Sequence, residues 1–421
     1  MTNTASFSIV RAAGGTLLST TESSKLPPFD PADPIGIDDL LSAEDLAIRG
    51  TVRDWAAGRV LPHIAEWYEN GELPGIRELA RELGSLGALG MSLQGYGCAG
   101  ATAVQYGLAC LELEAADSGI RSLVSVQGSL AMYAIHRFGS EEQRQRWLPG
   151  MAAGEIIGCF GLTEPDHGSD PAGMRTYAKR DGDDWVLTGR KMWITNGSVA
   201  GVAVVWAQTD EGGGAGGGIR GFVVPADSPG FSAPEIKHKW SLRASVTSEL
   251  VLDEVRLPAD AVLPGVTGLR GPLSCLGHAR YGIVWGAMGA ARASFEAALD
   301  YARTREQFGR PIGGFQLTQA KLADMAVELH KGILLAHHLG RRMDAGRLRP
   351  EQVSFGKLNN VREAIDICRT SRTILGANGI SLEYPVMRHA TNLESVLTYE
   401  GTVEMHQLVL GKALTGLDAF R

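Results

Sequence analysis

The spacing of apolar residues changes twice along the chain, and these changes divide it into three blocks. From about residue 38 to 158, apolar residues recur at every third or fourth position, which is the spacing of one face of an α-helix. From 159 to 272, short apolar runs alternate with Gly, Pro, Asp and Asn, a pattern typical of strands joined by turns. Helical spacing returns from 273 to 421. The chain is therefore expected to fold as helix, sheet, helix, an α+β multidomain protein.

The first block contains a recognisable helix start. Ser42 is followed three residues later by Asp45, which predicts a capping box. Apolar residues continue the helical pattern at Leu46, Val52, Trp55 and Val60. We expect further helices in this block near 74–87, 103–117 and 140–148.

The second and third blocks are predicted from longer runs. Strands are expected at 185–187, 202–206, 221–224 and 250–252, which together indicate a compact antiparallel β domain. The nearly pure glycine segment 211–218 predicts a flexible hairpin loop, because no strand-to-helix context follows as a phosphate-binding loop requires. Long helices are expected at 281–308, 316–345, 350–376 and 403–417.

Length and composition narrow the function class. A chain of 421 residues exceeds the size at which one core keeps growing, so two or three domains are expected. A hydrophobic fraction of 44% and a charged fraction of 21% are ordinary for a soluble protein, and no run approaches the roughly 18 apolar residues of a membrane helix. The net charge of -7 argues against a general nucleic-acid binder. We expect neither a nucleic-acid partner nor a membrane-spanning role.

Cysteine usage indicates reduced thiols and no metal site. The five cysteines are widely separated and form no C-x-x-C pair: Cys98, Cys110, Cys159, Cys275 and Cys368. Residues 1–37 are expected to form a flexible tail before the first helix. The first 25 or so are rich in Ser and Thr, as in an organellar transit peptide, but the few basic residues favour a disordered bacterial tail. The expected location is accordingly the cytoplasm in a bacterium, or the mitochondrial matrix in a eukaryote.

A carboxylate near the end of the chain is a candidate base. Glu400 lies between Tyr399 and Gly401, just before the last predicted helix. A carboxylate held there could abstract a proton. Taken alone, the same pattern also describes a solvated surface turn, so its interpretation depends on other motifs in the chain.

The β block carries residues suited to a flat heteroaromatic ring. Segment 159–165 reads Cys-Phe-Gly-Leu-Thr-Glu-Pro, 168–170 reads Gly-Ser-Asp, and 191–196 reads Lys-Met-Trp-Ile-Thr-Asn. Hydroxyls and backbone amides can bond the polar edge of such a ring while an indole packs on its face. By itself, Trp193 would be read as a core aromatic residue.

An arginine in the last block suits an anionic group. Segment 305–311 reads Arg-Glu-Gln-Phe-Gly-Arg-Pro, and Gln316 opens the next predicted helix. The Arg305 guanidinium could bind a pyrophosphate bidentately. The alternative for Arg305 alone is a solvated charge at a helix C-terminus, where the helix dipole favours cations.

In combination, these motifs resemble the acyl-CoA dehydrogenase family. Leu-Thr-Glu-Pro, Gly-Ser-Asp, Trp-Ile-Thr-Asn, Arg-x-Gln-Phe-Gly, Leu-Gly-x-Asn-Gly and Tyr-Glu-Gly-Thr occur in that order from about residue 38 to the end. Three stretches, at 95–100, 241–245 and 279–283, are most similar to the glutaryl-CoA-specific members of the family. Each fragment is weak evidence alone, but the ordered set is highly specific.

The resemblance implies an N-terminal α-helical domain, a central antiparallel β-barrel-like domain and a C-terminal four-helix-bundle domain, assembled as a homotetramer that binds FAD. The residues expected to face the flavin ring are Leu162, Thr163, Trp193 and Thr195. Arg305, Phe308 and Gln316 are expected to hold the FAD of a neighbouring subunit. The remaining positions assigned to the cofactor are Phe160, Ile194, Leu375, Gly376, Thr402 and Glu404. Ala377 departs from the family pattern, which usually has a second glycine there.

The resemblance also assigns the reaction. Dehydrogenation of an acyl thioester removes an α-proton and delivers a β-hydride to flavin N5, so the site needs one base and a polarised thioester carbonyl. Glu400 matches the family base, and its backbone N–H matches a donor to the thioester oxygen. Some members carry the base at the position of Ala279, and alanine cannot serve.

The expected substrate is a dicarboxylic mono-thioester. Arg121 follows Asp117-Ser118-Gly119-Ile120 and matches the arginine that binds the distal carboxylate in glutaryl-specific members. Without the resemblance, Arg121 would be a loop residue paired with Asp117 on the surface. The other residues assigned to the substrate are Ser122, Glu114, Ser125, Ser169, Arg280, Tyr399 and Gly401. Arg280 alone would equally suit a structural salt bridge.

The full expectation is FAD-dependent conversion of glutaryl-CoA to crotonyl-CoA and CO2, with electrons passed to an electron-transfer flavoprotein in lysine and tryptophan degradation. Glu114 and Tyr399 favour decarboxylation over release of glutaconyl-CoA. Alternatives are a short-chain monocarboxylic acyl-CoA dehydrogenase, a non-decarboxylating glutaryl-CoA dehydrogenase, an acyl-CoA oxidase and a catalytically silent scaffold.

Overall fold

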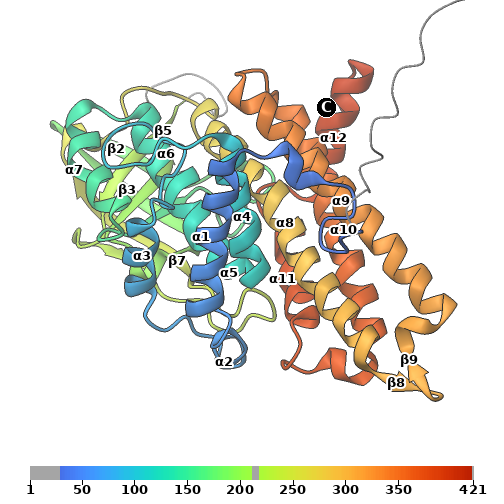
Figure 1. Ribbon diagram of the computed structural model, residues 1–421. Helices are drawn as coiled ribbons and strands as arrows, with labels where there is room; N and C mark the ends of the chain where they lie inside the picture. Colours follow the sequence, from blue (N-terminus) through green and yellow to red (C-terminus); the bar gives the residue numbers. More distant parts are fainter. Residues whose placement is uncertain (1–28, 211–217, 420–421) are drawn as a thin grey trace, which may run out of the picture.

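The computed structural model describes residues 29–210 and 218–419, in which a β region lies between two helical regions in the sequence. In space, the β region lies on the left of Figure 1 and the C-terminal helices on the right, with helices of the N-terminal region between them. This arrangement confirms the α+β architecture expected from the spacing of apolar residues. The sequence predictions for the first 28 residues and for segment 211–217 lie outside the described part. The described end of the predicted tail is folded, since Ile37 begins a 3-10 helix, Ile37–Leu40, and is buried.

The N-terminal helices follow the predicted pattern where they are amphipathic. The capping box is confirmed, because the Ser42 hydroxyl accepts from the Asp45 amide at 3.1 Å and the Asp45 carboxylate accepts from the Ser42 amide at 3.0 Å. The helices are α1 (Ala43–Arg59), α2 (Ile64–Asn70), α3 (Ile76–Ser85), α4 (Ala103–Ala116), α5 (Ser118–Ser125), η2 (Val126–Met132), α6 (Tyr133–Phe138) and α7 (Glu141–Ala152).

The run from α5 to α6 was not predicted. All of α5 and η2 is buried, so no polar face marks the helical period in the sequence. The side chain of Asp117 caps α5 by accepting from the Gly119 amide at 2.7 Å. The segment η2 is a π-helix, a form found mostly at functional sites. Residue 121 therefore lies on a buried helix, not in the surface loop of the alternative interpretation.

The central sheet curls around a core made by its own strands. The strands are β1 (Gly158–Gly161), β2 (Tyr177–Asp181), β3 (Asp184–Thr195), β4 (Val202–Gln208), β5 (Ile219–Pro225), β6 (Phe231–Ser232) and β7 (Thr247–Leu257). Trp185, Val205, Phe222 and Leu250 pack together on one face. The opposite face of β4, which includes Trp206, packs against buried residues of α6, of α7 and of the long helix Arg270–Thr304.

Strand pairing is mixed rather than wholly antiparallel. The pairs β2–β3, β3–β7, β4–β5 and β6–β7 are antiparallel, as predicted. However, β1 runs parallel to β4, with Gly158 opposite Val202, and β2 meets β4 in parallel at Tyr177. The prediction missed this because β1 enters directly from the helical region, whereas hairpin signals report only neighbouring strands.

The C-terminal region is a helical bundle with a small hairpin. Its elements are α8 (Arg270–Thr304), β8 (Glu306–Gln307), β9 (Arg310–Pro311), α9 (Gln316–Asp344), α10 (Pro350–Leu375), η7 (Gly376–Ile380), α11 (Val386–Thr398) and α12 (Val403–Thr415). Helix α10 packs against α8, α9 and α11. Two predictions need correction: α8 begins at Arg270 rather than near 281, and α11 was not predicted.

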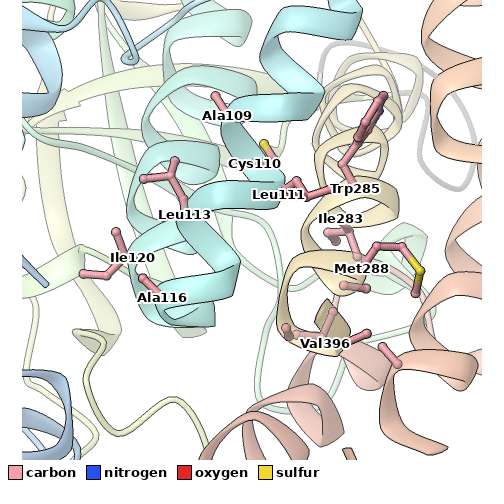
Figure 2. Packing of buried hydrophobic residues seen from close by; sticks show 14 of the residues in the cluster. Ala109, Cys110, Leu111, Leu113, Ala116, Ile120, Ile283, Trp285, Met288 and Val396 are labelled. Carbon is pink, nitrogen blue, oxygen red and sulfur yellow. The ribbon is translucent and has the colours of Figure 1, made fainter. Parts of the chain in front are cut away.

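Helices α4 and α8 join the N-terminal region to the bundle. Figure 2 shows Cys110 and Leu111 of α4 facing Ile283 and Trp285 of α8 in the shared apolar core. Gly107 permits this contact, because a Cβ there would lie 2.3 Å from the Trp285 indole. The relative position of the two helical regions is therefore fixed by packing. Within the described residues, no helix is both long and apolar enough to cross a bilayer.

A buried carboxylate also links α1, α4 and α8. Glu112 is 2% exposed and accepts hydrogen bonds from Arg53 at 2.9 Å and from Arg292 at 2.6 Å. Burial alone would raise the Glu112 pKa, but Arg292 and Arg53 together lower it to about 2. Since the folded-state pKa is depressed, this carboxylate contributes stability above its ordinary titration range and loses that contribution as pH falls toward 2.

We therefore expect Glu112→Gln to lower the free energy of unfolding by about 3 kcal/mol at pH 7. The difference from the wild type should shrink in urea titrations between about pH 5 and pH 3, where the wild-type contribution is lost. Glu328→Gln, which removes an exposed carboxylate paired with Lys331 on α9, is the control. Equal stability of the Glu112 variant and the wild type at pH 7 would contradict the prediction.

Candidate active site

The candidate base lies in a strained turn between α11 and α12. Glu400 has φ 53 and Gly401 has φ 100, both in the left-handed region. This conformation is uncommon for a residue with a side chain, and such strain concentrates at functional sites. The Tyr399 amide donates to the Ser395 carbonyl at the end of α11 and the Thr402 hydroxyl caps α12, so both helix ends that border the turn are defined.

Two cations hold the backbone of this turn. Arg280 of α8 donates from Nε to the Glu400 carbonyl at 2.6 Å. Lys357 of α10 donates from Nζ to the Tyr399 carbonyl and to the Gly401 carbonyl, the latter at 2.7 Å. Three consecutive carbonyl oxygens thus point toward buried positive charge. The sequence interpretation missed Lys357, because a single lysine in a predicted helix gives no signal of its burial.

The Glu400 carboxylate is available for chemistry. Its Oε2 atom is buried and has no hydrogen-bond partner among the described residues. Burial raises the Glu400 pKa above its usual range, although Arg121, Lys357 and Arg280 oppose the rise. A carboxylate with a raised pKa and a free oxygen suits a general base that works near neutral pH.

Arg121 is buried beside the base rather than exposed. It is 1% exposed, donates from Nε to Glu114 at 2.6 Å and donates from Nη2 to the Tyr399 hydroxyl. Glu114 is held in turn by Ser118, whose hydroxyl donates to it at 2.8 Å. These contacts use two of the five N–H donors of the guanidinium, so other donors remain for a ligand carboxylate.

Gly286 of α8 makes room for this ion pair. A Cβ at residue 286 would lie 2.0 Å from Glu114 Oε2 and 3.3 Å from Arg121 Nε. Any larger residue would displace the carboxylate from the guanidinium. The position of Arg121 therefore depends on packing between α4, α5 and α8, which the sequence interpretation did not detect.

The surface-loop alternative for Arg121 is wrong. Asp117 pairs with Arg388 of α11 at 2.5 Å and accepts from Asn392 at 2.9 Å, so it is not the partner of Arg121. Asp117, Arg388 and Asn392 are all buried. The 241–245 stretch contacts the same cluster, because the Leu242 amide donates to the Asn392 side chain at 2.8 Å.

The other predicted substrate residues divide into two groups. Ser122 and Ser125 lie on α5 with Arg121 and are buried, and the Ser125 hydroxyl has no partner among the described residues. Ser169 is exposed in the loop after β1. Arg280 makes no ion pair in the described part of the chain, so the salt-bridge alternative is not supported, whereas its bond to Glu400 places it at the base. Ala279 is buried.

The segments predicted to face the flavin ring are brought together by the sheet. The Met192 amide donates to the Thr163 carbonyl at 2.8 Å, which joins the segment after β1 to β3. A buried ion pair fixes the same junction: Lys191 donates to Glu164 at 2.8 Å and to the Leu162 carbonyl at 3.1 Å. Leu162, Thr163, Trp193 and Thr195 consequently lie on adjacent segments.

Trp193 provides the test of fit for FAD. Its side chain is 60% exposed and its φ is 62, a left-handed conformation that is unusual for a bulky residue. The core alternative is therefore wrong, because an indole held outward in a strained conformation presents its face to a ligand. These residues fit a flat heteroaromatic ring.

The second predicted cofactor group lies at the far end of the bundle. Figure 1 places the β8–β9 hairpin away from the β region, so one chain does not bring the two groups together. Phe308, at the hairpin turn, is 95% exposed with φ 51. Arg305, Gln316 and Gly376 are also exposed, whereas Leu375 is buried. Thr402 and Glu404 belong to the start of α12, where Thr402 caps the helix and Glu404 is exposed. The sharing of FAD between subunits remains a prediction.

Like Leu162 and Leu375, the predicted cofactor residues Phe160 and Ile194 direct their side chains into the core. Phe160 is 6% exposed and packs near Trp206, with ring centroids 6.2 Å apart. Ile194 is 4% exposed and belongs to the inner core of the sheet. Only the main chain of these two residues would be available to a cofactor. Among the described residues, no group of three or more His, Cys, Asp or Glu side chains is placed to hold a metal ion.

Comparison with known proteins matches all three regions to one family. Models of the acyl-CoA dehydrogenase N-terminal, middle and C-terminal domains match residues 42–155, 159–255 and 267–415. A short-chain specific acyl-CoA dehydrogenase from Bos taurus is 34% identical over 86% of this chain and 88% of its own length. A probable acyl-CoA dehydrogenase from Bacillus subtilis is 34% identical over 89% of this chain and 98% of its own.

Solved structures are similar over the same span. A glutaryl-CoA dehydrogenase from Mycobacterium smegmatis is 73% identical, with a TM-score of 0.90 over 93% of this chain and 99% of that one. A second one from M. smegmatis, in complex with FADH2, is 63% identical with a TM-score of 0.90 over the same shares. A glutaryl-CoA dehydrogenase bound to glutaryl-CoA is 32% identical, with a TM-score of 0.85 over 89% of this chain and 96% of that one. The chain therefore belongs to the acyl-CoA dehydrogenase family, whose cofactor is FAD.

Proposed function

We propose that this enzyme oxidatively decarboxylates glutaryl-CoA to crotonyl-CoA and CO2 and passes the electrons to an electron-transfer flavoprotein. The observation that carries the proposal is the buried Arg121, which contacts Tyr399 while the next residue, Glu400, presents a free carboxylate oxygen. The similarity to two M. smegmatis glutaryl-CoA dehydrogenases, at 73% and 63% identity, supports the same substrate.

In this mechanism Glu400 removes the α-proton of the substrate. The raised pKa of Glu400 makes its carboxylate basic enough to accept a proton near neutral pH. Among the described residues, no donor bonds to its Oε2 atom. The Glu400 N–H has no acceptor within residues 29–210 and 218–419, so it can donate to the thioester oxygen as charge develops there. When bound, FAD accepts the β-hydride at N5.

Arg121 would hold the distal carboxylate of the substrate. Among the described residues, the buried Arg121 guanidinium forms its ion pair with Glu114, and a second carboxylate can use its remaining N–H groups. After oxidation, the γ-carboxylate can leave as CO2, because the resulting dienolate is conjugated with the thioester. The proton that Glu400 took up can then return to this dienolate, which yields crotonyl-CoA.

A monocarboxylic short-chain substrate is the second candidate. Curated relatives at 34% identity are short-chain specific, and a butyryl-CoA dehydrogenase from Megasphaera elsdenii is 31% identical with a TM-score of 0.85. That function does not require a buried arginine beside the base, since a butyryl chain has no distal charge. The oxidase and silent-scaffold alternatives have no feature of the site in their favour.

The deciding experiment adds glutaryl-CoA or butyryl-CoA anaerobically to the purified holoenzyme. We expect glutaryl-CoA to bleach the flavin with at least a hundredfold greater kcat/KM, roughly the cost of leaving a buried charge unpaired, and to release one CO2 per turnover when an acceptor is supplied. Equal efficiency for both substrates would contradict carboxylate binding by Arg121. Bleaching without CO2 would indicate the non-decarboxylating alternative.

The proposed partners follow from exposed surfaces and from one relative. Several large apolar side chains of the C-terminal region are exposed, including Phe308, Leu317, Leu414 and Leu417, which supports burial of this region in a homotetramer. A chain in a structure of the electron transferring flavoprotein of Acidaminococcus fermentans is 31% identical over 89% of this chain, which supports electron-transfer flavoprotein as the acceptor. We propose a bacterial cytoplasmic enzyme of lysine and tryptophan degradation.

A further inference from the structure

We propose that Lys357 is a positioning residue for the base: its ammonium holds the strained Tyr399–Glu400–Gly401 turn and favours the ionised form of Glu400. This inference rests on the proposed role of Glu400 in α-proton removal. Lys357 is 2% exposed and lies within α10, which forms the centre of the bundle. A charge buried at such a position loses its hydration, so its burial requires a reason.

The first argument is geometric. Lys357 Nζ donates to the carbonyl groups on both sides of Glu400, those of Tyr399 and Gly401. A residue with φ 53 is held in the left-handed region only if its surroundings fix it there. The two bonds from Lys357 fix the carbonyl groups of the residues before and after Glu400, and Arg280 of α8 fixes the carbonyl of Glu400 itself. The direction of the Glu400 carboxylate and of its N–H thus depends on these bonds.

The second argument is electrostatic. The charged or titratable groups that face Glu400 come from every element packed around it: Arg121 on α5, Arg280 on α8, Lys357 on α10, His406 on α12 and Tyr399 in the turn. His406 is uncharged near neutral pH because burial, with the nearby cations, lowers its pKa to about 3. Burial raises the Tyr399 pKa to about 12, so its hydroxyl is also neutral.

Among these groups, Lys357 has a distinct role. Arg121 is already neutralised by Glu114 at 2.6 Å, whereas Lys357 and Arg280 make no ion pair among the described residues and hydrogen-bond to carbonyl groups. Lys357 makes two of these bonds and Arg280 makes one. Burial lowers the Lys357 pKa to about 7, and Glu400 opposes that shift. The two groups therefore stabilise each other's charged forms, and removal of the ammonium should raise the Glu400 pKa.

The test measures the pH dependence of flavin reduction by glutaryl-CoA in the wild type, Lys357→Met and Lys357→Arg holoenzymes. In Lys357→Met, which removes both the donors and the charge, we expect the acidic limb of kcat to move up by about one pH unit. We also expect kcat at pH 7 to fall about 10–100-fold, while KM changes less than about threefold. Lys357→Arg keeps the charge and should restore the position of the acidic limb. Lys331→Met, on the exposed face of α9, is the control.

An unchanged acidic limb in Lys357→Met that retains FAD would overturn the inference. If that variant does not yield holoenzyme, Lys357→Gln replaces it, since the amide keeps a donor but not the charge, and the same shift is expected. Failure of the proposed function is distinguishable, because the wild type itself would then show no bleaching by any acyl-CoA. Bleaching that persists in a Glu400→Gln enzyme would likewise contradict the role of the base and not that of Lys357 alone.

Discussion

Glu400→Gln should retain FAD and lose turnover by about 10²–10⁴-fold, the typical contribution of a general base. Glutamine has nearly the same shape as glutamate, so the turn and its bonds to Arg280 and Lys357 should persist. A neutral amide cannot accept the α-proton. The measurement is single-turnover flavin reduction by glutaryl-CoA, with the visible flavin spectrum as the check on cofactor content.

The matched control for this variant is Glu394→Gln. Glu394 lies on the exposed side of the preceding helix, where it pairs with Arg369 at 2.9 Å and has no contact with the turn. Its activity should equal that of the wild type. Flavin reduction at a near-normal rate in Glu400→Gln would mean that another group removes the proton, and the buried Ala279 provides no such group.

Removal of the guanidinium should change which substrate the enzyme prefers. In the double variant Arg121→Met/Glu114→Gln, we expect kcat/KM for glutaryl-CoA to fall about 10²–10³-fold, because its carboxylate would lie in an apolar site without a partner. Turnover of butyryl-CoA should rise, since its methyl end would no longer face the unused N–H donors of a buried guanidinium. Steady-state kinetics with both substrates measure the ratio.

The double variant is preferred because Arg121→Met alone would leave Glu114 buried without its counter-ion. Breaking a buried pair in this way costs about 3–5 kcal/mol of stability and could prevent folding. Arg369→Met/Glu394→Gln removes a matched ion pair from the surface and should leave both kinetics and stability near the wild type. An unchanged preference for glutaryl-CoA in the Arg121 double variant would contradict carboxylate recognition by Arg121.

The amphipathic helices could be predicted from sequence because each has one polar and one apolar face, whereas β4 and β5, which are almost wholly buried, were marked by apolar runs between turn residues. The capping box at Ser42 and the start of α9 at Gln316 are examples. Prediction failed for α5 and η2, where every residue is buried and no periodicity remains visible. The parallel pairing of β1 with β4 was also missed, because it joins strands that are separated by two others.

The site shows a similar division. Glu400, Arg121 and Trp193 could be identified because they lie in short ordered motifs. Lys357 could not, since its role arises from contact between α10 and a turn more than forty residues later in the chain. Gly286 was missed for the same reason: it matters only through the space it leaves for Glu114 on another helix. Such long-range contacts leave no local pattern in the sequence.

The contact between Tyr399 and Arg121 has a consequence for the length of the acyl chain that the site accepts. Arg121 belongs to the N-terminal region, whereas the turn that carries Glu400 is tied to α8 and α10 of the bundle. Because Tyr399 bonds to the guanidinium and precedes the base directly, the distance between the two ends of the site is set by one residue. The site would therefore select diacids by length. An acyl group one methylene shorter or longer than the five-carbon group would misplace either its carboxylate or its α-carbon.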